Sequence, residues 1–137
     1  MINSFKEKLL YKFTKKYWKL INQKHGILNN FTVQKGLFKD LKLNKEQYWN
    51  SGDLGSKIYG FYEKDVQEIM IKIVKKYKIK QFINIGSADG FFPIGFLRLK
   101  LFKNAICFEQ NKIGQKSIIQ NAITNKVLNK IKVYGEI

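Results

Sequence analysis

The sequence predicts an α/β fold: a parallel three-stranded sheet, with helices between the strands, that follows a basic helical extension. Two observations carry this prediction. A short apolar strand at 82–85 runs into a turn of small residues, Gly86–Gly90, and an apolar segment long enough for three helical turns follows the turn. Strand patterns at 104–108 and 131–134 then enclose the helical pattern 112–124. Strands that alternate with helices form parallel sheets, here in the order 3-2-1.

The first 50 residues are expected to form the extension, and residues 51–137 the sheet domain, with the turn cluster 50–53 between them. In 3–22, apolar residues recur at spacings of three and four among lysines, which predicts an amphipathic helix ending near Gly26. This helix either covers the domain with its aromatic side or lies on an anionic membrane with Trp18 at the interface. Two short strands or extended segments, 31–33 and 37–43, are expected next.

The helix predicted over 63–77 has an unbroken apolar stripe and is expected to pack on the core along that stripe. Its members are Val66, Ile69, Met70, Ile73, Val74 and Tyr77. The helical segment 91–101 is apolar nearly all around, which predicts burial on more than one side. Its Pro93 falls in the first turn, where a missing N–H costs little.

The spacing of the turn distinguishes two cofactors. A dinucleotide site has the pattern Gly-x-Gly-x-x-Gly, whose third small residue would fall on Phe91, where a large ring obstructs helix–strand packing. Small residues at 86, 88 and 90 instead fit the Gly-x-Gly-x-Gly turn of class I S-adenosylmethionine-dependent methyltransferases, with Ala88 as the middle residue. The helix start near Asp89 and Gly90 is expected to offer unpaired N–H groups to a ligand.

An acidic residue stands at the end of the second predicted strand. Glu109 lies 23 positions after Gly86, which is about where a Rossmann-like sheet places the carboxylate that holds ribose hydroxyls. The alternative is a carboxylate that only faces water. In either case Glu109 is expected to contribute little to stability.

Residues from about 36 to 137 resemble the amino-terminal half of a class I methyltransferase, and most closely the FkbM-type group. The stretch 55–63 resembles the Gly-x-Tyr-Glu entry to the helix before the first strand, and 82–95 resembles the INIGxxxGxxxxG block. Phe108-Glu109 resembles the FE strand end, and 120–125 the xNAxxN helix. Asn84 departs from the group, because an acidic residue is usual at its position.

The resemblance implies that S-adenosylmethionine binds with its methionine side at the turn, its ribose at Glu109 and its adenine near the ends of the second and third strands. The implied residues are Gly86, Ser87, Ala88, Asp89, Gly90, Glu109, Gln110, Glu136 and, at the mouth of the site beside Tyr62, Glu63. No residue is identified as a catalytic base. The remainder of the sheet, from which such enzymes often draw catalytic residues, is missing, so the sequence is expected to be a fragment of a methyltransferase.

The net charge of +16 would suit nucleic acid or anionic lipid. The excess is spread evenly over the two parts of the chain, and only one of the 26 basic residues is arginine, the residue favoured for bidentate phosphate contacts. Nucleic acid is therefore not expected as a partner, and the methyl acceptor is expected to be a small molecule or glycan. A non-catalytic basic module and a NAD-dependent oxidoreductase fragment are the alternatives.

Several simple features indicate a cytoplasmic location. No apolar run reaches the length of a membrane span, and the amino terminus lacks the apolar core of a secretory signal. The single cysteine, Cys107, falls inside a predicted strand, and the single histidine, His25, gives little for a metal site. The alternative is a cytoplasmic protein that contacts the inner face of the membrane through 3–22.

Overall fold

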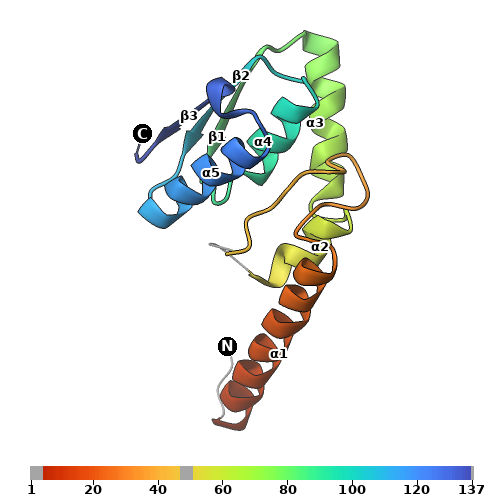
Figure 1. Cartoon of the computed structure of the whole chain (residues 1–137), viewed down its shortest axis with the longest axis vertical. Helices are drawn as coiled ribbons and strands as arrows, with labels where there is room; N and C mark the ends of the chain where they lie inside the picture. The colour runs from red at the N-terminus through yellow and green to blue at the C-terminus, as the bar shows by residue number, and fades with distance from the viewer. Residues whose placement is uncertain (1–4, 47–50, 137) are drawn as a thin grey trace.

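The computed structural model describes residues 5–46 and 51–136 and contains one parallel sheet. Its strands are β1 (Gln81–Ile85), β2 (Asn104–Phe108) and β3 (Ile131–Tyr134), in the spatial order β1-β2-β3 (Figure 1). The α/β fold with a parallel sheet in the order 3-2-1 is therefore confirmed, and the sheet is a Rossmann-like unit. Ile85, Phe108 and Tyr134 lie side by side in register, so the three carboxyl ends form one edge.

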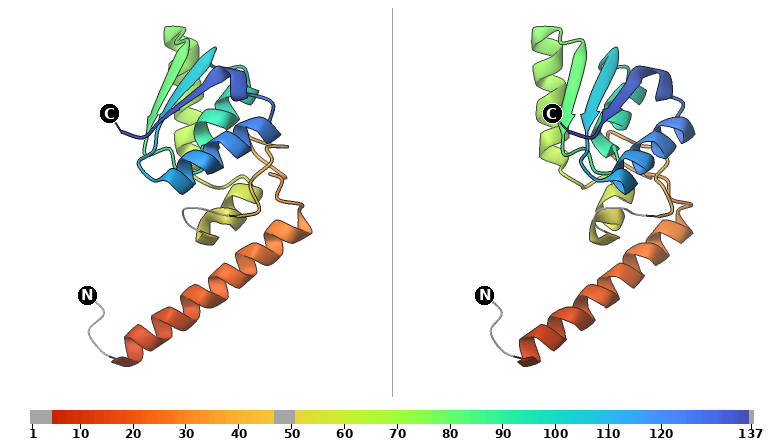
Figure 2. Two further views of the ribbon diagram at one scale, coloured as in Figure 1. Left: turned by 60° about the vertical axis from the view of Figure 1, so that its left-hand side comes forward. Right: turned by 90° about the vertical axis from the view of Figure 1, so that its left-hand side faces the viewer.

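Two helices cover one face of this sheet (Figure 2). The first, α4 (Phe91–Arg98), has Phe91, Ile94, Phe96 and Leu97 buried, as expected for a segment that is apolar nearly all around. It ends three residues before the predicted end. The second, α5 (Lys112–Thr124), begins at Asn111, whose side chain accepts a hydrogen bond from the Ile113 N–H at 2.8 Å, a standard N-cap.

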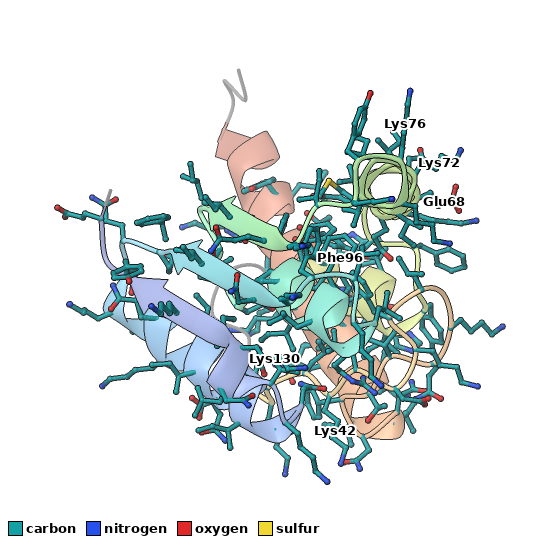
Figure 3. The ribbon with its side chains drawn as sticks, turned by 90° about the horizontal axis from the view of Figure 1, so that it is seen from above. Lys42, Glu68, Lys72, Lys76, Phe96 and Lys130 are labelled. Atoms are coloured by element: carbon teal, nitrogen blue, oxygen red, sulfur yellow. The ribbon has the colours of Figure 1, made fainter. Side chains whose placement is uncertain are left out.

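Phe38 links the extension to the sheet domain. Its ring packs edge-on against Phe91 and Phe96, and it lies against Gly95, where a Cβ would come within 2.7 Å of the ring. Phe96, which is fully buried, reaches from α4 toward the sheet and contacts Phe82 (Figure 3). Buried side chains from 31–43 thus belong to the same hydrophobic cluster as those of α4 and β2. One core therefore includes residues from both predicted parts of the chain.

The predicted strands at 31–33 and 37–43 form only a single antiparallel bridge, between Thr32 and Lys42. Residues 37–40 form a turn, with Asp40 in the left-handed region at φ 66°, so the second segment is not a strand. Backbone hydrogen bonds from Val33 to Leu41 and from Leu43 to Phe31 still hold the two segments together. Asn125 instead binds the backbone of Lys42 with both ends of its amide, at 3.0 and 2.8 Å. This contact fastens the extension to the carboxyl end of α5.

The second face of the sheet is largely open. Because side chains alternate along a strand, Phe82 and Asn84 point to the helices, while Ile83 and Ile85 point the other way. Ile83 and Ile85 are 54% and 68% exposed, and Tyr134 on β3 is 46% exposed.

The helix before β1, α3 (Lys64–Tyr77), does not pack on the core along its whole apolar stripe, contrary to what the sequence predicts. Of its apolar stripe, Val74 is buried and Met70 packs against the core, but Val66, Ile69, Ile73 and Tyr77 are exposed. The stripe as a whole is therefore not core packing. The polar side chains Glu68, Lys72 and Lys76 follow the outer side of the same helix (Figure 3).

The amino-terminal helix, α1 (Phe5–Leu28), is longer than predicted and projects away from the sheet (Figure 2). Gly26 lies inside this helix rather than at its end. Its contact with Phe31 and Leu54 leaves no room for a larger side chain, which explains the glycine. Residues 3, 4 and 50, which belong to the predicted helix and turn cluster, lie outside the described residues. Residues 10–20 are all exposed, so the expectation that this helix covers the domain with its aromatic side is wrong.

Three short helical segments complete the described chain: η1 (Ser51–Asp53), α2 (Leu54–Ile58) and η2 (Leu128–Lys130). Within 5–46 and 51–136, none of the helices combines the length and the apolar character needed to cross a membrane.

Candidate functional site

A cavity of about 660 Å³ lies at the carboxyl edge of β1 and β2, a size typical of small-molecule sites. Five residues predicted from the sequence meet in its lining, namely Gly86, Ala88, Glu109, Gln110 and Glu136. The rest of the lining consists of Tyr62, Ile85, Phe108 and Gly135. The structure thus gathers these nine residues from four separate segments around one space.

The turn after β1 is held in an unusual backbone conformation. Gly86, Ala88 and Gly90 all have positive φ, at 72°, 49° and 77°. The Gly86 and Ser87 N–H groups both donate to the Phe108 carbonyl, at 2.9 and 3.0 Å, which fastens the turn to the end of β2. Left-handed backbone is costly for any L-residue because of its Cβ, and glycine at 86 and 90 avoids that cost.

Gly86 and Gly90 need their small size for different reasons. A Cβ on Gly86 would have no atom within 4 Å and would point into open space beside the cavity. A Cβ on Gly90 would lie 2.9 Å from Ile94 and 3.2 Å from Ile118. Gly86 is therefore free of packing demands and borders the cavity, whereas Gly90 allows close packing of α4 and α5.

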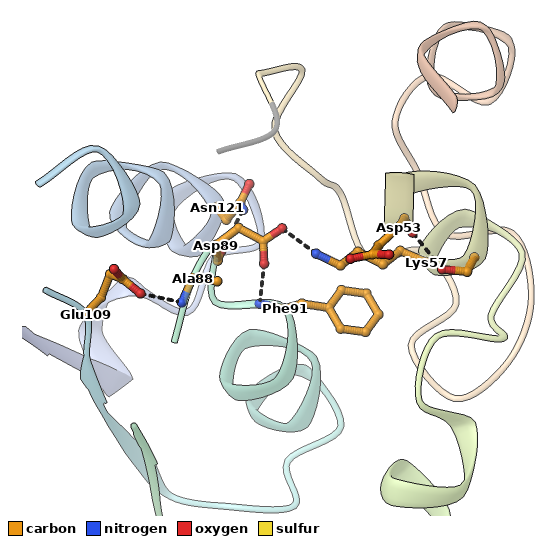
Figure 4. Close-up of polar contacts among 8 residues, drawn as sticks. Asp53, Lys57, Ala88, Asp89, Phe91, Glu109 and Asn121 are labelled. Atoms are coloured by element: carbon orange, nitrogen blue, oxygen red, sulfur yellow. Dashed lines mark hydrogen bonds and ion pairs between the residues drawn. The ribbon is translucent and has the colours of Figure 1, made fainter. Parts of the chain in front are cut away.

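Glu109 connects the turn to the segment after β2. One carboxylate oxygen accepts a hydrogen bond from the Ala88 N–H at 2.8 Å (Figure 4), and the other accepts one from the Asn111 N–H at 2.9 Å. The residue is only 8% exposed. The expectations of a carboxylate facing water and of little effect on stability are therefore wrong, because Glu109 satisfies two backbone donors that would otherwise be unpaired.

The amino end of α4 also differs from expectation. The Gly90 N–H donates to the Ser87 carbonyl at 2.8 Å, and the Phe91 N–H donates to the Asp89 carboxylate at 3.2 Å (Figure 4). These groups are thus not the unpaired donors that the sequence suggested. The Asp89 carboxylate, rather than a ligand, accepts the Phe91 N–H at this helix end.

Asp89 makes a buried ion pair that the sequence analysis did not detect. The Lys57 ammonium lies 2.7 Å from a carboxylate oxygen of Asp89, and both side chains are 7% exposed. The same ammonium lies 5.1 and 5.2 Å from the ring centres of Tyr62 and Phe91. The Asn121 amide donates to the Asp89 carbonyl at 2.8 Å. Asp89 therefore joins α2, α4 and α5 and does not line the cavity.

Three other predicted residues also lie outside the lining, and one of them is Gly90, the packing position between α4 and α5. Ser87 is buried, and its hydroxyl donates to the Asn84 carbonyl at 2.7 Å. Glu63 is exposed at the start of α3, next to the Tyr62 hydroxyl. Glu63 is thus beside the mouth of the cavity but not on its wall.

Tyr62 offers a hydroxyl to the cavity from the segment before α3. Burial, followed by the negative charge of Glu63, raises the pKa of Tyr62 to about 12. The hydroxyl therefore stays protonated near neutral pH, and its hydrogen bond to the Glu63 carboxylate helps to hold that proton.

The charge of the cavity contrasts with that of the chain. Glu109 and Glu136 carry carboxylates into the lining, and none of the lining residues that the structure describes is a lysine or an arginine. The chain as a whole has a formal net charge of +16. This donor and acceptor set suits a cationic or hydroxyl-bearing ligand and disfavours a phosphate.

Some of the lining could have been inferred from register. Ile85 and Phe108 are paired last residues of parallel strands, and such ends share an edge. Gly135 follows the end of β3 in the same way. No sequence signal marked Lys57, because a single buried lysine has no spacing pattern.

Cys107 is expected to be unreactive in the folded protein. It is fully buried in β2, and burial raises the pKa of its thiol to about 11. At pH 8 only about a thousandth of the thiol is then ionised, and the thiolate is the reactive form. A colorimetric disulfide reagent should give no rapid signal in buffer and one equivalent in denaturant. Rapid labelling in buffer would show that β2 is accessible.

Across the described ranges there is no cluster of three or more histidine, cysteine, aspartate or glutamate residues that could hold a metal ion.

Neither a protein-family model nor a curated protein sequence matches the chain. Among solved structures, a candidate caffeoyl-CoA O-methyltransferase from Staphylococcus aureus aligns with 53% of this chain at 16% identity and a TM-score of 0.48. A candidate tRNA methyltransferase from Streptococcus pneumoniae aligns with 47% of it at 21% identity and a TM-score of 0.39. The alignments span 34% and 30% of those two chains. The fold assignment rests on the parallel sheet itself.

Proposed function

We propose that the cavity binds S-adenosylmethionine and that the chain supplies the cofactor-binding part of a methyltransferase. The observation that carries the proposal is the charge of the lining, whose described residues include the carboxylates of Glu109 and Glu136 and no basic side chain. S-adenosylmethionine is a sulfonium cation that contains ribose and adenine but no phosphate. An acidic cavity in a strongly basic chain favours such a ligand over an anionic one.

The amino end of α4 argues against a dinucleotide. A pyrophosphate is normally bound by the free N–H groups and the positive dipole end of this helix. Here Asp89 occupies that position with a carboxylate held by Lys57 and the Phe91 N–H. A pyrophosphate would find the Gly90 and Phe91 N–H groups already bonded within the chain, so a NAD-dependent oxidoreductase is disfavoured.

Glu109 is suited to hold the ribose. Each of its oxygens already accepts one backbone N–H and retains a further lone pair for a hydroxyl donor. The turn at Gly86 and Ala88 would face the methionine part, and Gln110 and Glu136 would lie near the adenine, as the sequence resemblance implies.

When bound, the cofactor would supply an electrophilic methyl group, and this chemistry needs mainly alignment of the acceptor by the protein. Tyr62, which lines the cavity and keeps its hydroxyl proton near neutral pH, would contact the ligand from the segment before α3. A small molecule or glycan stays the predicted acceptor.

Substitution of Gly86 by alanine tests the site. Its methyl group would enter the open space beside the cavity and occupy room that the ligand needs at the turn. Titration calorimetry should show that the unaltered chain binds S-adenosylmethionine in preference to NAD. Gly86→Ala should weaken that binding by at least about tenfold, equivalent to roughly 1.4 kcal/mol.

Gly36→Ala is the matched control. Gly36 has φ +79°, close to that of Gly86, and lies against Gly60 rather than the cavity. Both substitutions should lower stability by about 1–2 kcal/mol through left-handed strain, and Gly36→Ala somewhat more because its Cβ would lie 3.0 Å from the Gly60 carbonyl oxygen; only Gly86→Ala should lower affinity. Tighter binding of NAD by the unaltered chain, or equal affinity losses in both variants, would contradict the proposal.

A further inference from the structure

Residues 10–20 of α1 have no cover from the rest of the described chain. The helix extends from the body of the molecule (Figures 1 and 2), and every residue in this stretch is exposed. Six of them are large and apolar or aromatic, with 53–65% of each residue exposed: Leu10, Tyr11, Phe13, Tyr17, Trp18 and Leu20. Contiguous exposed apolar surface of this kind marks an interaction site more often than isolated apolar residues do.

The lysines of this stretch lie on a separate side of the helix. Lys12, Lys15, Lys16 and Lys19 follow a helical spacing of three and four. With about 100° of rotation per residue, their side is roughly opposite to the side that carries Leu10, Phe13 and Tyr17. The sequence has no acidic residue between positions 8 and 39 that could neutralise them.

The other end of α1 is fixed to the molecule. The Asn22 side chain accepts a hydrogen bond from the Gly55 N–H at 2.6 Å and donates one to the Trp18 carbonyl at 2.8 Å. His25 is hydrogen-bonded to the Tyr59 hydroxyl at 2.9 Å, and Gly26 packs against Phe31. The exposed half is thus held away from the core and can contact a surface without any rearrangement of the domain.

We propose that α1 binds the surface of an anionic lipid bilayer, with its apolar side at the boundary between head groups and acyl chains. Lysines beside such a helix pair with lipid phosphates, and tryptophan and tyrosine prefer this interfacial depth. Nucleic acid would also attract the lysines, but it offers no apolar phase for Leu10, Phe13 and Leu20. A lipid surface offers phosphates to the lysine side of the helix and an apolar phase to the other side, so it is favoured over nucleic acid.

Binding to vesicles tests the proposal with the full chain. Vesicles of phosphatidylcholine mixed with phosphatidylglycerol should sediment the chain, and vesicles of phosphatidylcholine alone should not. In a Trp49→Phe background, the emission of Trp18 should shift to shorter wavelength with the anionic vesicles only.

Two variants of α1 separate charge from apolar contact. Glutamine at positions 12, 15, 16 and 19 should lower the partition coefficient at least about a hundredfold, since each lysine near an anionic surface contributes about fivefold. Leu10→Ser, Phe13→Ser and Tyr17→Ser together should give a similar loss with all lysines intact. Because these side chains are exposed, unfolding midpoints should match that of the parent.

The matched control replaces four exposed lysines outside α1 by glutamine, namely Lys72, Lys75, Lys76 and Lys80. It has the same net charge as the α1 lysine variant and should keep vesicle binding. An equal loss in this control would overturn the proposal, because general charge would then explain the binding. It would also be overturned if the serine variant kept full binding, or if a DNA duplex were bound instead of vesicles.

Discussion

Replacement of Lys57 by methionine should lower the free energy of unfolding by about 3–5 kcal/mol. The ammonium of Lys57 is the cation that neutralises Asp89, at 2.7 Å, and both side chains are almost completely buried. Methionine preserves much of the side-chain volume, so the loss would come from an uncompensated carboxylate in the interior rather than from a large cavity. Urea denaturation measures it directly.

Two comparisons give this result its meaning. Lys64→Met breaks an exposed pair with Glu68, at 3.7 Å, and should change stability by less than about 1 kcal/mol. Lys57→Met combined with Asp89→Asn should be more stable than Lys57→Met alone, because the buried charge is then gone while an acceptor for the Phe91 N–H is kept. If the double variant lost the sum of the two single losses, the pair would not be coupled.

The ion pair of Lys57 and Asp89 also affects the cavity. Lys57 lies between Asp89, at the end of the glycine turn, and the ring of Tyr62, which lines the cavity. The turn is therefore held from α2, a segment more than 25 residues earlier in the chain. Spacing rules cannot find such a contact, because they describe neighbours along one element and not the packing of two elements.

The strands, in contrast, could be predicted because their pattern is local in the sequence. β2 and β3 are short apolar runs bounded by polar residues, and the residues that close them are the ones the sequence suggested, Asn104–Phe108 and Ile131–Tyr134. Parallel pairing then brings the carboxyl ends of the strands to one edge of the sheet. Glu109 and Gln110 could therefore be placed beside Gly86 from the sequence alone. Local pattern and topology were sufficient there.

The apolar stripes along the helices were less informative about which residues are buried. The periodicity of α3 shows correctly which side of the helix is apolar, but it contains no information on what covers that side. Val66, Ile69, Ile73 and Tyr77 are exposed, and so is the apolar side of α1 at Leu10 and Phe13. In α5 the same limit appears, since Ile118 is buried while Ile113 is 64% exposed.

Glu109→Gln should reduce the affinity for S-adenosylmethionine about tenfold to a hundredfold, if the ribose is held as proposed. Charge-assisted hydrogen bonds contribute about 1.5–3 kcal/mol each before desolvation, and 1.4 kcal/mol corresponds to about a decade in affinity. Glutamine keeps the shape of the side chain but loses the charge and turns one acceptor into a donor. Stability should fall as well, by about 1–3 kcal/mol, because either the Ala88 or the Asn111 N–H loses its partner.

Gln115→Met separates these two effects. The Gln115 amide donates to the Glu109 carbonyl at 2.7 Å, so its loss should destabilise the same strand end by about 1 kcal/mol without altering the carboxylate. Affinity in this variant should stay within about twofold of the parent when both are measured by calorimetry under conditions where the proteins are fully folded. A fall in stability in Glu109→Gln with unchanged affinity would mean that Glu109 only fastens the turn to β2, and that the ribose hydroxyls are bound elsewhere.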